Sequence, residues 1–103
     1  MNKFVLHPEA YLDLEGIWNF IAKDSPVAAD RVREKIYSTI RNLIRFPHQG
    51  HTRTDLASPR LRFVTVFDYL IAYAPEENPL LVVAVVHGRR NPKLIARVLK
   101  GRL

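Results

Sequence analysis

The sequence has 103 residues, which predicts one domain with one core over residues 1–103. With 48% hydrophobic and 25% charged residues, its composition is that of a globular protein rather than a disordered one. Cysteine is absent, which excludes disulfides, thiolate metal ligands and thiol nucleophiles and favours a reducing, cytoplasmic location. No run of about 18 apolar residues occurs, so we expect no membrane-spanning segment.

The charge is positive and unevenly distributed. Sixteen Lys and Arg residues stand against ten Asp and Glu residues, a formal net charge of +6. From His87 to the last residue there is no acidic residue, and this segment contains six bases: Arg89, Arg90, Lys93, Arg97, Lys100 and Arg102. Such a cluster attracts polyanions, either nucleic acid or an acidic partner, although a solvated basic tail is the simpler alternative.

Two helices are predicted after a short first strand. Residues 2–6 form the strand candidate, which ends at His7-Pro8, and the apolar spacing of residues 11, 14, 18 and 21 predicts a helix over residues 8–23. Ser25-Pro26 is typical of a new helix start, and the second helix continues to about Phe46. Because so few residues join the two helices, they must form an antiparallel hairpin.

Residues 47–60 are loop-like, and the pattern then changes to that of strands. Residues 61–67, 69–74 and 80–87 are rich in Val, Ile, Phe and Tyr. The segment 80–86 is apolar on both faces, which predicts a central strand covered on both sides. Asn91-Pro92 starts a short C-terminal helix. The predicted class is therefore α+β, in the order β-α-α-β-β-β-α, with the hairpin packed on a mainly antiparallel sheet.

Five segments in this order are similar to one family of small toxins. They are DLEGIWNFIA (13–22), DSPVAADR (24–31), FPHQGHTRTDL (46–56), LRFVTVFDYLIAY (61–73) and VVHGRRNP (85–92). Together they span most of the chain, and by this resemblance it is identified as a member of the ParE/RelE-like superfamily of type II toxin–antitoxin toxins, with the ParE branch favoured.

The resemblance implies a toxin that forms a hetero-oligomer with a cognate, ParD-like, DNA-binding antitoxin and is neutralised by it. Members of the ParE branch inhibit DNA gyrase, whereas RelE-type members cut mRNA on the ribosome. We expect no cofactor, no membrane association and no sequence-specific DNA binding by this chain itself.

RNA cleavage without a metal would need proton-transfer groups and cations at the scissile phosphate. The candidates for this chemistry are Arg62, His87, His48 and His51. Nucleases of this superfamily tend to place a Tyr or His near the C-terminus, and this chain has neither after His87. A non-enzymatic toxin is therefore the favoured interpretation. A ribosome-dependent mRNA endonuclease, and a decayed toxin that retains only antitoxin binding, remain alternatives.

Two binding surfaces follow as hypotheses. The candidates for target binding and toxicity are basic residues: Arg53, Arg62, Arg89, Arg90, Lys93 and Arg97. The candidates for antitoxin binding combine aromatic and basic residues: Trp18, Phe20, Arg62 and Arg89. His48 and His51 lie close to Asp55 in sequence, but their spacing is not that of a metal site, so we expect none.

Overall fold

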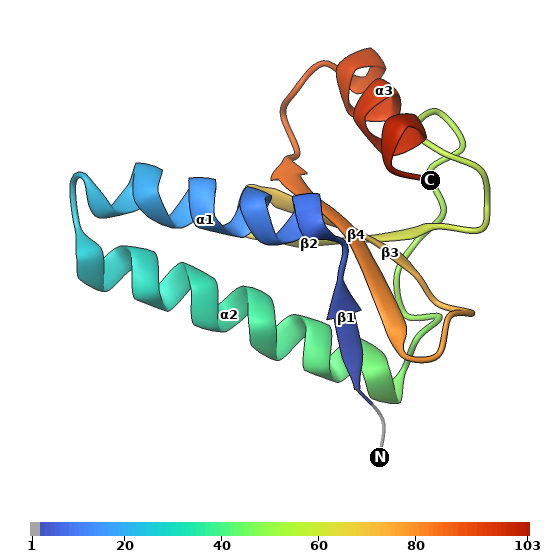
Figure 1. Cartoon of the computed structure of the whole chain (residues 1–103), viewed down its shortest axis with the longest axis horizontal. Helices are drawn as coiled ribbons and strands as arrows, with labels where there is room; N and C mark the ends of the chain where they lie inside the picture. The colour runs from blue at the N-terminus through green and yellow to red at the C-terminus, as the bar shows by residue number, and fades with distance from the viewer. Residues whose placement is uncertain (1–2) are drawn as a thin grey trace.

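The computed structural model describes residues 3–103. Its elements follow the predicted order: β1 (Phe4–Leu6), α1 (Pro8–Ala22), α2 (Pro26–Arg45), β2 (Arg62–Val66), β3 (Tyr69–Ala74), β4 (Leu80–His87) and α3 (Pro92–Arg102) (Figure 1). Asn2, the first residue of the predicted N-terminal strand, lies outside the described residues. Among residues 3–103, no helix combines the length and apolar character needed to cross a membrane.

The four strands form one mixed sheet in the order β1-β4-β3-β2. β1 is parallel to β4, while β4 with β3 and β3 with β2 are antiparallel, which confirms the predicted α+β class with a mainly antiparallel sheet. β1 is much shorter than β4, and its last residue, Leu6, pairs with Val82. Beyond Val82, β4 therefore continues to His87 without a strand partner on this side in the described part of the chain.

The helices α1 and α2 form the hairpin layer on one face of the sheet. The Ser25 hydroxyl accepts a hydrogen bond from the Ala28 N–H at 3.1 Å, so the predicted cap holds the start of α2. The buried residues of the two helices contact the sheet residues Val66, Ile71, Tyr73, Val82 and Val85. In this cluster they are Ala10 and Leu14 of α1 and Ile36, Ile40 and Leu43 of α2, and Ala29 of α2 is buried outside it. The connected ends of the helices extend past the sheet (Figure 1).

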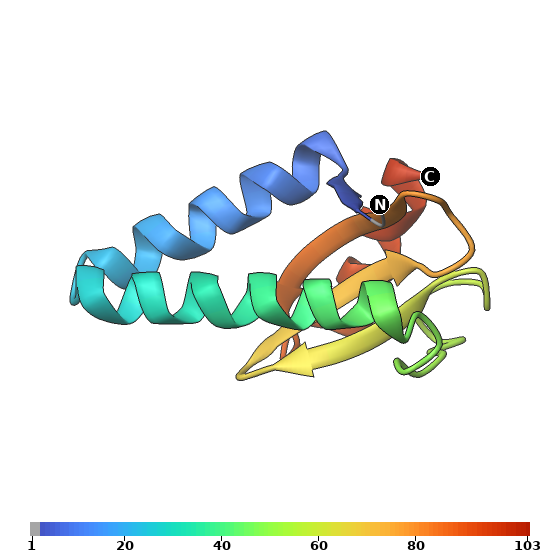
Figure 2. The same ribbon diagram turned by 90° about the horizontal axis from the view of Figure 1, so that it is seen from below.

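The opposite face of the sheet is covered by the α3 layer, which consists of α3 and residues 56–61 of the loop between α2 and β2 (Figure 2). Ile95 and Leu99 of α3 pack with Leu56 and Leu61 of the loop against this face. β4 is consequently covered on both sides, as its apolar run predicted, and Val82, Val83 and Ala84 are completely buried.

Candidate functional site

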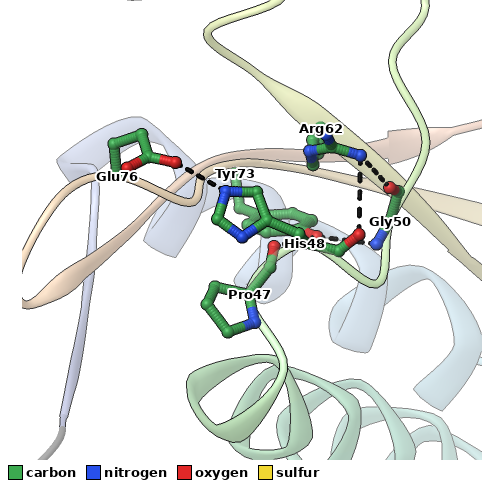
Figure 3. Close-up of polar contacts among 6 residues, drawn as sticks. All are labelled: Pro47, His48, Gly50, Arg62, Tyr73 and Glu76. Carbon is green, nitrogen blue, oxygen red and sulfur yellow. Dashed lines mark hydrogen bonds and ion pairs between the residues drawn. The ribbon is translucent and has the colours of Figure 1, made fainter.

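Two side chains of the sheet fix the start of the loop between α2 and β2 (Figure 3). Tyr73 of β3 is completely buried. Its hydroxyl accepts a hydrogen bond from the Gly50 N–H at 2.9 Å and donates one to the Pro47 carbonyl at 2.8 Å. Arg62 of β2 donates to the Gly50 carbonyl at 2.8 Å. Both polar groups of the Gly50 backbone are thus bound by side chains, which holds the loop in one conformation.

Gly50 is required at this point by close packing. A Cβ atom there would lie 2.6 Å from the Tyr73 hydroxyl oxygen and 2.8 Å from the Phe63 carbonyl oxygen. Burial raises the pKa of the Tyr73 hydroxyl, opposed by the hydrogen bond from Gly50 and the charge of Arg62. The hydroxyl therefore keeps its proton at neutral pH and can donate it to Pro47.

The two loop histidines lie at the same end of the sheet as Arg62. The Nε2 atom of His48 contacts the Glu76 carboxylate, and both side chains are exposed (Figure 3). His51 is exposed, and its backbone pairs with that of Phe63. Three of the four nuclease candidates therefore share one end of the sheet, but Arg62 and His48 are already engaged by other groups.

His87 lies at the other end. Arg62 of β2 pairs with Tyr73 of β3, whereas His87 of β4 pairs with Tyr69 of the same strand β3. Four residues of strand separate these positions, roughly 13 Å at about 3.3 Å per residue. The His87 ring packs edge-on against Tyr69, with centroids 5.7 Å apart, and its Nδ1 accepts a hydrogen bond from the Arg89 N–H at 3.2 Å. The structure does not bring His87 and Arg62 together.

Asp55, the acidic residue near the loop histidines, is bound to Arg53. Its two oxygens accept hydrogen bonds from Arg53 at 2.9 and 2.8 Å. This hydrogen bonding lowers the pKa of the exposed Asp55 carboxyl and raises that of Arg53. Within residues 3–103, no three His, Asp or Glu side chains are grouped so that they could hold a metal ion.

The remaining toxicity candidates lie around the start of α3. Arg89, Arg90, Lys93 and Arg97 are all exposed. Arg89 is 3.9 Å from the Asp68 carboxylate in the β2–β3 turn. Four of the six basic candidates are therefore close together, while Arg53 lies in the loop between α2 and β2 and Arg62 lies at the start of β2.

The antitoxin-binding candidates occupy different places. Trp18 donates a hydrogen bond to Asp30 at 2.9 Å, and the Arg33 guanidinium lies 5.4 Å from its ring centroid, so Trp18 joins the two helices of the hairpin. Phe20 is 70% exposed. It lines a groove between α1 and the end of β4, with Leu12, Gly16, Tyr69, His87 and Arg90 among the other lining residues. Arg89 is near this groove, whereas Arg62 lies at the opposite end of the sheet.

Comparison with protein families gives a match over residues 4–92 to the ParE toxin of the type II toxin–antitoxin system parDE. The chain belongs to the ParE toxin family. The match ends at residue 92, where α3 begins, so the family pattern covers the hairpin and the whole sheet but not the C-terminal basic helix.

A solved structure supports the same fold for this ParE-family toxin. A chain described as the chromosomal ParDE TA system from P. aeruginosa superimposes with a TM-score of 0.68 at 17% sequence identity. The alignment covers 84% of this chain and 96% of that chain. No curated protein sequence matches this one.

One polar pair in the toxin was not predicted from its sequence. Arg102 of α3 binds Asp13 of α1 through two hydrogen bonds of 2.6 and 3.0 Å, and the two side chains are only 10% and 17% exposed. Arg102 also donates to the Val83 carbonyl at 3.1 Å, and Asp13 accepts from the Val85 N–H at 3.0 Å. The hydrogen bonding of the Arg102 guanidinium to Asp13 is the main cause that raises the pKa of Arg102.

The Asp13–Arg102 pair occupies the position that a longer β1 would have. Val83 and Val85 lie one and three residues after Val82, the residue at which pairing with β1 ends. Side-chain groups therefore satisfy backbone groups that would otherwise lack a strand partner. The sequence carries a signal for Asp13 but not for its partner, because Asp13 lies between Ala10 and Leu14 on the buried side of α1.

Proposed function

We propose that this ParE-family chain is a cytoplasmic toxin that inhibits DNA gyrase by binding and is neutralised by a cognate ParD-like antitoxin. The observation that carries this proposal is the separation of His87 from Arg62, which share no reaction centre. A general base or acid has to come within about 2.6–3.2 Å of the proton that it transfers, directly or through one water. A separation of roughly 13 Å along the strand is far beyond that range.

The engagement of the remaining nuclease candidates also favours binding over catalysis. Arg62 donates to a loop carbonyl, and His48 is held by Glu76, so neither is free to meet a phosphate without leaving its partner. The exposed cations near α3, by contrast, are available for a target. A binding toxin is therefore the function that agrees with both the family and the geometry.

The proposal is tested with purified, antitoxin-free protein, gyrase, ATP and supercoiled plasmid. We expect linear DNA, from trapped double-strand breaks, only when the toxin is present, and its suppression when the antitoxin is added. The His87→Gln variant should trap gyrase as well as the unchanged protein does. Intact plasmid from a folded, growth-inhibiting protein, together with cut mRNA on ribosomes and loss of that cutting in His87→Gln, would contradict it.

For the antitoxin, the exposed apolar stripe of α1 is the surface that we propose. Leu12, Gly16 and Phe20 follow one another at four-residue spacing, and Leu12 and Phe20 are 62% and 70% exposed. The space where a Cβ atom would stand at Gly16 has no neighbouring atom within 4 Å, so a partner can approach the helix closely there. An amphipathic helix or strand of the antitoxin fits such a groove.

Substituting Phe20 tests this surface. Phe20→Glu should weaken antitoxin binding by about 30-fold, the effect of losing roughly 2 kcal/mol at the centre of an interface. The matched control is Phe46→Glu, because Phe46 is also exposed, at 54%, but lies at the far end of α2. Equal affinities of both variants, measured by calorimetry, would move the antitoxin surface elsewhere. Gyrase trapping by Phe20→Glu should be unchanged.

A further inference from the structure

The outer side of α3 carries a row of cations. Lys93, Arg97 and Lys100 are spaced four and three residues apart, which places them on one side of the helix, and all three are exposed. Arg89 and Arg90 are exposed just before the helix. We call these five residues the basic face of α3. Apart from Arg89, which is 3.9 Å from Asp68, none of them forms an ion pair within residues 3–103.

The position of these cations opposes the stability of the helix. The first turn of α3 contains no acidic residue, and Arg89, Arg90 and Lys93 surround its N-terminal end. That end of a helix has a partial positive charge, so cations there are unfavourable and acidic residues are the stabilising choice. An arrangement that disfavours the helix itself is understandable if the face serves a ligand of opposite charge.

The composition of the face decides between an acidic protein and a nucleic acid. Of the large apolar side chains, only Leu94 and the terminal Leu103 are exposed in α3 and the residue after it, at 45% and 67%. Protein interfaces have an apolar centre from which charged residues, lysine among them, are depleted. Interfaces with DNA are more polar and much more positive. The face therefore matches a polyphosphate surface rather than a protein.

We infer that the basic face of α3 binds the phosphate backbone of double-stranded DNA without sequence preference. From Lys93 to Lys100 the helix rises about 10 Å, and duplex DNA carries a phosphate about every 1.7 Å along its axis, so several phosphates lie within reach. Asn91, the polar residue beside the face that could read a base edge, caps α3 by accepting a hydrogen bond from the Lys93 N–H at 2.9 Å. Only the choice of DNA rather than RNA rests on the proposed function, because gyrase acts on DNA.

The fixed orientation of α3 keeps this face outward. Ile95, Leu99 and Arg102 point the other way, toward the sheet and α1, so that three anchors hold the helix while the cations face solvent. Removing α3 altogether would expose the sheet and leave Asp13 without its partner. Surface substitutions are therefore the appropriate test, with circular dichroism to verify that each variant is folded.

The experiment measures binding of the antitoxin-free protein to a fluorescently labelled random-sequence duplex at several salt concentrations. Each phosphate contact contributes about 0.9 to the slope of log affinity against log salt. The variant Lys93→Gln, Arg97→Gln, Lys100→Gln should therefore lose about 2.7 from the slope and bind more weakly. The control Arg31→Gln, Lys35→Gln, Arg45→Gln removes three exposed charges from α2 instead, and its slope should stay near that of the unchanged protein.

Each contrary result is informative. Absence of duplex binding at low salt, or an equal loss of slope in the α2 control, would overturn the inference. Tenfold tighter binding to an RNA duplex or to polyglutamate would overturn it in favour of an RNA or an acidic protein. If the chain binds DNA but never traps gyrase, the proposed function fails and this inference stands. If the chain traps gyrase without binding free DNA, the proposed function stands and this inference fails.

Discussion

The two layers that cover the sheet are held in different ways. The hairpin layer has helices of 15 and 20 residues, and six of their residues are buried against the sheet or each other. The helix of the α3 layer has 11 residues, of which only Ile95 and Leu99 are buried, and its last turn is fixed by the Asp13–Arg102 pair. A broad apolar interface stabilises the first layer, whereas a narrow one assisted by a polar pair stabilises the second.

This difference explains how α3 can be so basic. A helix that buries a wide stripe has few positions left for charge, but α3 needs only one narrow side for its anchors. The remaining positions are free for Lys and Arg. The hairpin layer and the sheet therefore provide the stable scaffold, and α3 is a small attached element whose outer side is available for binding.

The largest expected effect comes from breaking the polar anchor of the α3 layer. Asp13→Asn removes the charge opposite Arg102, which is only 10% exposed, and we expect a loss of about 3–5 kcal/mol in the free energy of unfolding. Urea denaturation measures it. The control is Glu34→Gln, because Glu34 pairs with Arg41 on the surface, where such pairs contribute about 0–1 kcal/mol. Similar losses in both variants would show that the buried pair is no special anchor.

An intermediate effect is expected from opening a cavity in each layer. Ile36→Ala in the hairpin layer and Ile95→Ala in α3 should each cost about 2–5 kcal/mol, with Ile36→Ala the more severe because α3 can shift to fill part of the space. Hydrogen exchange distinguishes them further. Ile95→Ala should raise exchange in α3 while the hairpin stays protected, and Ile36→Ala should raise it throughout. A uniform response in both variants would mean that the layers unfold as one unit.

The smallest effect is expected at the start of the loop between α2 and β2. Tyr73→Phe leaves the Gly50 N–H and the Pro47 carbonyl without their partner, which should cost about 1–3 kcal/mol. A stability loss well below that range would indicate that Arg62 alone can hold the loop.

The same tyrosine predicts a pH dependence. Because burial raises its pKa above the ordinary value of 10.0, the folded state keeps the proton more tightly than the unfolded state. This contribution to stability is complete below pH 10 and is lost as the pH rises above it. Urea midpoints measured on both sides of pH 10 should fall more steeply for the unchanged protein than for Tyr73→Phe; parallel curves would assign the alkaline loss to other groups.

Local chemistry in the sequence predicted most of the fold. Ser25-Pro26 and Asn91-Pro92 mark helix starts through capping and the fixed φ of proline, and both helices begin at the expected proline. The apolar run from Leu80 to Val86 predicted a strand covered on both sides because no face of it is polar. Each of these signals depends on neighbouring residues, which is why periodicity and turn residues sufficed.

The placement of the candidate residues was harder to predict because it depends on long-range pairing. Asp13 and Arg102 are 89 residues apart, and nothing local in the sequence joins them. The separation of His87 from Arg62 did follow from information in the sequence. In an antiparallel series of three strands, the start of the first strand and the end of the third lie at opposite ends of the sheet. The basic character of α3 was visible from the sequence, but its outward orientation depends on which residues anchor it.

The Asp13–Arg102 pair also bears on how the toxin behaves in concentrated solution. A strand edge with unpaired backbone groups is a template for another chain, and β4 is almost entirely apolar, with no proline or charged residue. While the carboxylate and the guanidinium occupy the Val83 and Val85 backbone groups, that stretch of the edge is closed to a second molecule. Whenever α3 detaches, the edge opens, and the chain becomes prone to aggregate through β4.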